Sequence, residues 1–253
     1  SRVADSDELD AAIGMIATAL AFPTHAQSTR GAADPTLDDT MVAGGFLDGH
    51  PDLKFRNMGL DAYGRKDFVE AINRFKQAAS YGDKPSQAVV AEMYWDGIAG
   101  DRDRVLGLVW MDMAAERGYD FFSKKRDYYW NALTSEERKQ ALARARDVFA
   151  EYGDAAAEPR LAAALRRERG RMTGSRVGSM TSSVQIIVPG YGSLDASKFY
   201  DPQFWDPKQY RAWQDAYWTD LKPGRVEVGE PVKVAEPSAV SEPSPRQAKQ
   251  DQP

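Results

Sequence analysis

The middle of the chain carries apolar and small residues at helical spacing. One set falls at positions i, i+3, i+4 and i+7, on one face of a helix: Phe55, Met58, Gly59 and Ala62. After a polar break, a second set follows on one face of a further helix: Phe68, Ile72, Phe75 and Ala79. Asp67 is placed to cap this second helix, and Gly82 is placed to end it in a left-handed conformation. The pattern therefore predicts a helix hairpin.

This pattern repeats. Residues 104–118 align with residues 68–82 at a constant offset of 36 positions. The shared small residues are Ala78, Ala79 and Gly82 in the first stretch and Ala114, Ala115 and Gly118 in the second. Small residues at a fixed period are typical of stacked helix pairs, because closely packed helices have little room for larger side chains.

A third, less regular pair is predicted over residues 121–153, where Thr134 and Glu137 form a capping box. Residues 159–169 are predicted to form a further helix that covers the last pair, since terminal repeats need an end cap. The sequence therefore predicts a mostly α fold with about three antiparallel helix hairpins in residues 53–170.

The character of the chain changes on both sides of this region. Residues 1–50 contain scattered Gly and Pro with little periodicity, which predicts a flexible leader. Residues 171–228 are predicted to form an aromatic-rich extension that packs on the repeats. This extension should contain a short strand or hairpin arm at 184–188 and an aromatic helix capped by Asp206 and Pro207. Residues 229–253 are rich in Pro, Ser, Glu, Lys and Gln, which predicts disorder.

A short apolar run within the leader has two interpretations. Residues 13–26 contain an apolar stretch followed by small residues, which resembles a signal-peptide remnant, but the residues before it are acidic. The alternative is an amphipathic helix. A signal remnant would favour the periplasm or cell envelope, and its absence the cytoplasm. The run is too short to cross a bilayer, so no transmembrane segment is predicted.

Composition excludes several kinds of chemistry. The formal charge of −5 makes nucleic acid an unlikely partner, because binding phosphates requires a positive surface. The chain has no cysteine and only two histidines, His25 and His50, which lack partners at metal-ligand spacing and are expected to be solvated loop residues. The paired Glu136 and Glu137 fit the charge preference of a helix N-terminus. No catalytic residue, metal ligand or cofactor site is predicted.

The first hairpin resembles a tetratricopeptide repeat, with matching residues at Phe55, Met58, Gly59, Ala62, Ala71, Phe75 and Ala78. The second resembles a Sel1-like repeat, a relative with a longer turn, through Tyr94, Gly97, Asp103, Trp110, Ala114, Ala115, Glu116 and Gly118. Val90 and Ala91 stand where that family has Leu and Gly, and Leu106 and Gly107 where it has Lys and Ala. The resemblance covers roughly residues 53–153.

The resemblance implies a right-handed solenoid that acts as an adaptor or scaffold, without catalysis or cofactor. By similarity to tetratricopeptide helices, the groove-facing residues would be Arg56, Leu60, Tyr63, Glu92 and Trp95. We expect these to bind a partner protein, since concave solenoid faces present extended surfaces. The alternative is that Tyr63 and Trp95 pack against the aromatic extension. The identity of the partner and the oligomeric state cannot be read from the sequence.

The aromatic extension also has two interpretations. Trp205, Trp213 and Tyr217 could fold back along the repeats, because so many exposed aromatics would leave an apolar patch that soluble monomers rarely carry. They could instead form a secondary contact that stacks sugars. The leading hypothesis is a non-enzymatic helical-repeat protein that binds another protein, and the alternative is a cell-envelope accessory protein or enzyme that binds glycan.

Overall fold

The computed structural model describes residues 35–173 and 185–220. This part of the chain is mostly helical, with one short two-stranded antiparallel sheet, as the sequence predicted. The possible signal remnant at residues 13–26 and the tail at residues 229–253 lie outside the described residues. Within them, no helix combines the length and apolar character that a membrane span needs.

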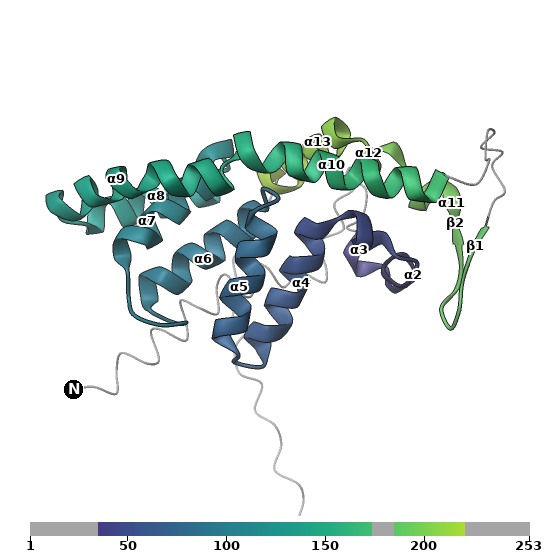
Figure 1. The fold of residues 1–253 in the computed structure, drawn as a ribbon, viewed down its shortest axis with the longest axis horizontal. Coiled ribbons are helices and arrows are strands. Elements are labelled where there is room, and N and C mark those ends of the chain that lie inside the picture. Colours follow the sequence, from purple (N-terminus) through teal and green to yellow (C-terminus); the bar gives the residue numbers. More distant parts are fainter. Residues whose placement is uncertain (1–34, 174–184, 221–253) are drawn as a thin grey trace, which may run out of the picture. The chain divides into compact units, whose positions relative to one another are not determined.

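Two tight helix hairpins form the centre (Figure 1). The first consists of α4 (Pro51–Gly64) and α5 (Phe68–Ala79), and the second of α6 (Lys84–Asp96) and α7 (Arg104–Ala114). Helix α5 also packs on α6, so the hairpins are consecutive neighbours. Ala78 and Ala114 are both completely buried at corresponding places in α5 and α7. The stacked hairpins that the repeat predicted are therefore confirmed.

Glycines allow the helices of each hairpin to approach closely. A Cβ atom on Gly59 of α4 would lie 2.7 Å from the Phe75 ring of α5, and one on Gly107 of α7 would lie 3.0 Å from Cβ of Trp95 in α6. The helix ends also follow the sequence. The Asp67 carboxylate accepts the Glu70 amide at 3.1 Å, and Gly82 has φ of +81°. The capping residues thus determine where these helices begin and end, and the glycines determine how closely they pack.

The third helix pair differs from the first two. Helices α8 (Asp120–Ala132) and α9 (Ser135–Tyr152) each pack on α7 but make few contacts with each other. Thr134 and Glu137 form the predicted capping box at the start of α9. A short 3-10 turn, η2 (Ala115–Arg117), joins α7 to the segment before α8. The third pair is therefore open, with α7 lying between its two helices.

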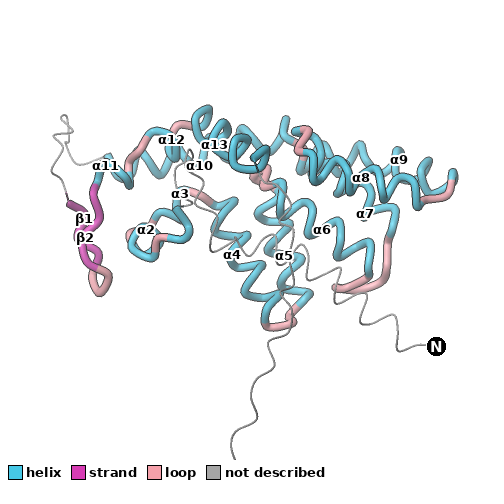
Figure 2. Tube along the Cα trace, turned by 180° about the vertical axis from the view of Figure 1, so that it is seen from behind, coloured by secondary structure: helices cyan, strands magenta, loops and turns pink. Residues whose placement is uncertain are grey.

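Helix α10 (Asp154–Thr173) begins earlier than the sequence suggested. The prediction placed its start at Pro159, which instead lies inside the helix. Gly153, which has extended backbone angles (φ −66°, ψ 162°), interrupts the helix only briefly, so α10 continues after α9 (Figure 2). Helix α10 contacts α9, which precedes it, and it also contacts α3 (Phe46–Gly49) and α4.

The sequence predicted a flexible leader over residues 1–50, but the last part of this range is helical. Residues 35–49, assigned to that leader, form η1 (Pro35–Leu37), α2 (Asp39–Ala43) and α3 (Phe46–Gly49). Phe46 and His50 are completely buried. Their partners come from α10 and from the C-terminal region, more than a hundred residues away, so the local Gly and Pro content gave no indication of this packing.

The described part of the C-terminal extension comprises residues 185–220. It begins with a hairpin of β1 (Gln185–Val188) and β2 (Gly192–Asp195), in which Ile186 pairs with Leu194. Three helices follow: α11 (Ala196–Phe199), α12 (Pro202–Trp205) and α13 (Pro207–Asp220). Asp206 caps α13 by accepting the amides of Lys208 and Gln209, as predicted.

The described residues enclose two apolar cores. One lies among α4 to α9 and contains the buried faces of the first two hairpins. The other joins the N-terminal helices, α10 and the extension through these buried residues: Met41, Phe46, Leu53, Leu161, Leu165, Val188, Leu194, Phe199, Phe204, Trp205 and Tyr210. The extension is therefore part of the folded body formed with α3, α4 and α10.

Close helix contact in the first hairpin can be tested at two glycines of α4. Gly59→Ala should lower the free energy of unfolding by about 1–3 kcal/mol, because the new methyl group meets the buried Phe75 ring. Gly64→Ala is the matched control, since nothing lies within 4 Å of its added Cβ, and it should stay within about 1 kcal/mol of wild type. Urea unfolding measures both, and equal effects would contradict the close contact.

Candidate partner-binding groove

The residues predicted to form a partner-binding strip do not form an exposed surface. Arg56, Glu92 and Trp95 are buried, with 4%, 7% and 7% of their surface exposed. Leu60 and Tyr63 are partly buried and pack against the first core. Three of the five residues are thus inaccessible to a partner, and a role in binding remains a prediction only for Leu60 and Tyr63.

Helix α8 covers two of these residues. The Trp95 ring stacks on Tyr129 of α8 with ring centroids 3.8 Å apart, and the Arg104 guanidinium lies 4.9 Å from the Trp95 ring. Glu92 pairs with Lys125 of α8 at 3.1 Å. Neighbouring helices therefore use the predicted binding residues to contact one another.

The aromatic extension folds onto the body of the protein, so it does not form an open row of rings. Trp205 is buried beside His50, and its indole nitrogen donates to the Phe199 carbonyl at 2.5 Å. Trp213 and Tyr217 are partly buried, with ring centroids 6.1 Å apart. None of the predicted secondary-contact residues, Trp205, Trp213 and Tyr217, belongs to the large apolar side chains that the described residues expose.

A buried charge layer joins these elements, and we define it by six side chains: Asp52, Arg56, Asp83, Lys84, Arg117 and Asp154. Its first part lies between α4 and α6, where Arg56 binds both carboxylate oxygens of Asp83. The Asp52 Oδ2 atom accepts hydrogen bonds from Tyr210 at 2.7 Å and Gln214 at 2.9 Å, both from α13. Burial raises the pKa of Asp52, and the charge of His50 and the hydrogen bond from Tyr210 oppose that effect.

The second part of the buried charge layer fixes the start of α10. The Lys84 ammonium group donates to the Met113 carbonyl and pairs with Asp154 at 3.0 Å. Arg117 binds both oxygens of Asp154 at 2.9 Å, which holds the pKa of that carboxyl down at about 2 despite its burial. Burial lowers the pKa of Lys84, against the pull of Asp154. The layer thus positions α10 and α13.

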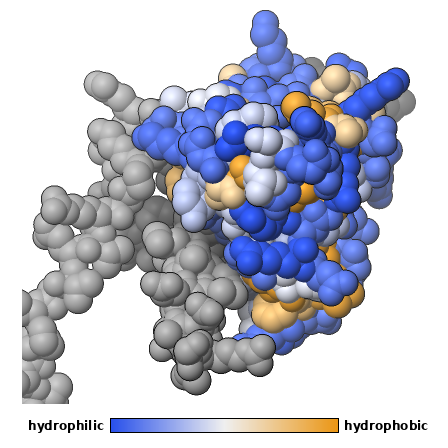
Figure 3. Space-filling view, turned by 90° about the vertical axis from the view of Figure 1, so that its left-hand side faces the viewer, coloured by the Kyte–Doolittle hydropathy of each residue, from blue (hydrophilic) through white to orange (hydrophobic). Residues whose placement is uncertain are grey.

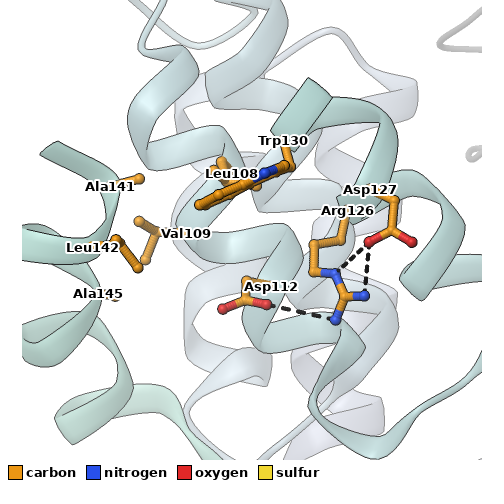
Figure 4. Close-up of a pocket in the computed structure, with 9 residues that line it drawn as sticks. All are labelled: Leu108, Val109, Asp112, Arg126, Asp127, Trp130, Ala141, Leu142 and Ala145. Carbon is orange, nitrogen blue, oxygen red and sulfur yellow. Dashed lines mark hydrogen bonds and ion pairs between the residues drawn. The ribbon is translucent and has the colours of Figure 1, made fainter. Parts of the chain in front are cut away.

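An accessible groove lies instead between the two helices of the open third pair (Figure 4). It has a volume of about 310 Å³, with α7 as its floor and α8 and α9 as its walls. The residues that line it are Leu108, Val109, Asp112, Arg126, Asp127, Trp130, Ala141, Leu142 and Ala145. Each helix contributes residues four apart along one face, so the groove follows the helices.

One part of the groove is apolar and accessible. Leu142 of α9 is 67% exposed and Trp130 of α8 is 39% exposed, whereas Val109, which lies beside Leu142 on the floor, is buried (Figure 4). The guanidinium of Arg138 lies 5.1 Å from the Trp130 ring centroid and donates to the Trp130 carbonyl, which supports the indole from one side. At the end of the molecule that carries α9, small apolar patches interrupt a mostly hydrophilic surface (Figure 3).

The other part of the groove carries charge. Arg126 pairs with Asp127 at 2.8 Å and more loosely with Asp112 at 3.9 Å, so two carboxylates share one guanidinium. Burial raises the pKa of Asp112. Within the residues that the structure covers, no group of three or more potential ligands could hold a metal ion. The groove therefore offers an apolar floor and a charged end.

The sequence interpretation missed both the groove and His50. It singled out neither Trp130 nor Leu142 as a binding residue, because only the spacing between α8 and α9 brings them together. His50 was expected to be solvated, yet it is completely buried and contacts the carbonyls of Phe46 and Phe204. The run His50-Pro51-Asp52 at the start of α4 was an available signal, although its partners lie over 150 residues away.

Comparison with known proteins adds a distant structural likeness. No family model matches the chain, and no curated protein matches its sequence. Among solved structures, the chain is similar to c5321, described as a protective antigen of uropathogenic Escherichia coli strains with an SLR fold. The TM-score is 0.39 at 18% identity, over 60% of this chain and 35% of that protein. This chain thus spans about a third of the length of that protein.

The buried Glu92 gives a pH test of how α6 and α8 pack. Burial raises its pKa to about 7, against the opposing charge of Lys125. The folded protein therefore retains a proton between pH 4.5 and 7 that the unfolded chain releases, so the contribution of Glu92 to stability falls as pH rises through this range. Each pKa unit corresponds to about 1.4 kcal/mol.

We expect the stability of wild type minus that of Glu92→Gln to decrease from pH 4.5 to 7 and to level off above. Urea unfolding of both proteins across this range measures the difference. Glu136→Gln is the control, because Glu136 is exposed at the start of α9. A pH-independent difference would show that Glu92 titrates normally and is not buried as described.

Proposed function

We propose that this chain is a non-enzymatic helical-repeat protein that binds another protein through the groove between α8 and α9. The observation that carries the proposal is the open third helix pair, which leaves Trp130 and Leu142 accessible over an apolar floor. Soluble proteins rarely leave such apolar surface exposed unless it has a partner. Tryptophan at a partly desolvated position is also a frequent anchor of protein interfaces.

The shape of the groove favours a helix as its occupant. Its floor and both walls are helices, and the lining residues recur four apart along each of them: Leu108 and Asp112, Arg126 and Trp130, Ala141 and Ala145. An amphipathic helix lying in this direction would bury its apolar face against Trp130 and Leu142. Ala141 and Ala145 leave room for close approach of its backbone.

The charged end favours a basic residue on that helix. Asp112 and Asp127 share only Arg126, so this end of the groove carries one negative charge more than it carries positive. A lysine or arginine of the partner would supply the missing positive charge. Glycan binding by the extension receives less support, because Trp205 is buried and Trp213 is partly covered.

The proposal can be tested by photo-cross-linking at two exposed apolar positions. A benzoylphenylalanine at position 142 should cross-link a specific partner in the native host, and one at position 187 should not. Ile187 is the matched control, since it is 82% exposed but lies on β1, away from the groove. Equal cross-linking at both positions would contradict the assignment of the groove.

The same partner should lose at least tenfold in affinity for Leu142→Asp and for Trp130→Ala. Both substitutions alter exposed side chains, so the thermal midpoint should change little. Ile187→Asp should bind like wild type. Isothermal titration with the cross-linked partner measures the affinities, and undiminished binding by Leu142→Asp would exclude the groove.

A further inference from the structure

His50 connects the N-terminal helices to the extension through contacts of both its ring nitrogens. Its Nδ1 atom lies 2.8 Å from the Phe46 carbonyl oxygen of α3, and its Nε2 atom lies 2.7 Å from the Phe204 carbonyl oxygen of α12. The ring is completely buried, stacked on Phe46 at 4.0 Å and flanked by Trp205 and Tyr210. Both ring nitrogens therefore face acceptors, with water excluded.

A neutral imidazole cannot satisfy this arrangement. It has one N–H donor and one nitrogen lone pair, whereas the imidazolium form has two donors. In either neutral tautomer, one lone pair would face a carbonyl oxygen at hydrogen-bond distance, and two acceptors repel each other. We infer that His50 is protonated in the folded protein and that this proton holds the extension, so that docking of α12 and α13 weakens when His50 loses it.

The surrounding charges support a positive ring. Asp52 accepts two hydrogen bonds on Oδ2, from Tyr210 and Gln214, whereas its buried Oδ1 atom has no hydrogen-bond partner among the described residues. Arg56, on the same helix as Asp52, already binds both oxygens of Asp83. When Asp52 is ionised and His50 is neutral, the group of Asp52, Arg56 and Asp83 keeps one uncompensated negative charge. Protonation of His50 balances it.

Two opposing effects act on the pKa of His50. Burial lowers it, and the Asp52 carboxylate and the carbonyls of Phe46 and Phe204 raise it. The second group prevails in our proposal, because removing the proton leaves a ring nitrogen lone pair buried against a carbonyl oxygen at hydrogen-bond distance. On the side of α10, Glu168 is buried near Gly49 and pairs with Arg171 at 3.0 Å, so its charge has a partner of its own.

The consequence is a pH-dependent attachment of the extension. Release of α12 from His50 would expose apolar surface of α3 and α10, including Phe46, Leu161 and Leu165. A folded-state pKa above the ordinary value stabilises docking fully at low pH and loses that effect as pH rises through the folded-state pKa. The attachment should therefore be tightest in mild acid and weaker in base.

Nuclear magnetic resonance of the His25→Gln protein tests the protonation directly, because His50 is then the only histidine. At pH 6.5 both ring nitrogens of His50 should carry a proton, and the midpoint of its titration should lie above the ordinary value of about 6.5. Hydrogen exchange should show α12 and α13 losing protection relative to α6 and α7 above that midpoint. Comparing the two sets of helices at each pH removes the intrinsic pH dependence of amide exchange, which both sets share.

A difference in stability gives an independent test. His50→Gln cannot titrate, so the stability of wild type minus that of the variant should fall as pH rises from 6.5 to 9. A neutral ring at pH 6.5, or a difference that rises between pH 5 and 8, would overturn the proposal. If His50→Gln does not fold, the resonance and exchange measurements on the full chain decide the question alone.

Discussion

The fold depends on pairing the charges that it buries. Arg56, Asp83 and Lys84 have almost no exposed side-chain surface, and Arg117 and Asp154 have little. An unpaired charge in such a position costs several kcal/mol, so each element that contributes one is held against the element that contributes its partner. Because the charges come from α4, the start of α6, the end of η2 and the start of α10, this layer fixes where those elements meet.

The open groove follows from the same layer. Asp154 is the first residue of α10, and Lys84 and Arg117 hold its carboxylate. Its amide also donates to Glu116 at 3.0 Å. Helix α10 therefore starts against the second hairpin and runs toward α3 and α4, where Leu161 and Leu165 join the second core. It cannot also fold back over α8 and α9, so the space between them remains open.

The sequence predicted the parts of the fold that local chemistry determines. Asp67, Gly82 and the capping box of Thr134 and Glu137 act within one helix turn, and all lie where predicted. The small residues at the hairpin contacts could be predicted because they recur at a fixed period in the sequence. The burial of Trp95 could not be predicted, because Trp and Tyr at helical spacing suit both a binding surface and a core. Only the position of Tyr129 on α8 distinguishes the two.

Residues with distant partners account for the remaining differences. His50 follows Gly49, within a stretch whose composition is typical of a loop, and its burial depends on Phe204 and Trp205. The sequence contained the aromatic extension and the His-Pro-Asp run, but no local pattern connects them. Their juxtaposition requires α10 first to carry the chain back along α4 and α3. A charge layer that directs one helix thus also brings together the imidazole and the carbonyl that hold the extension.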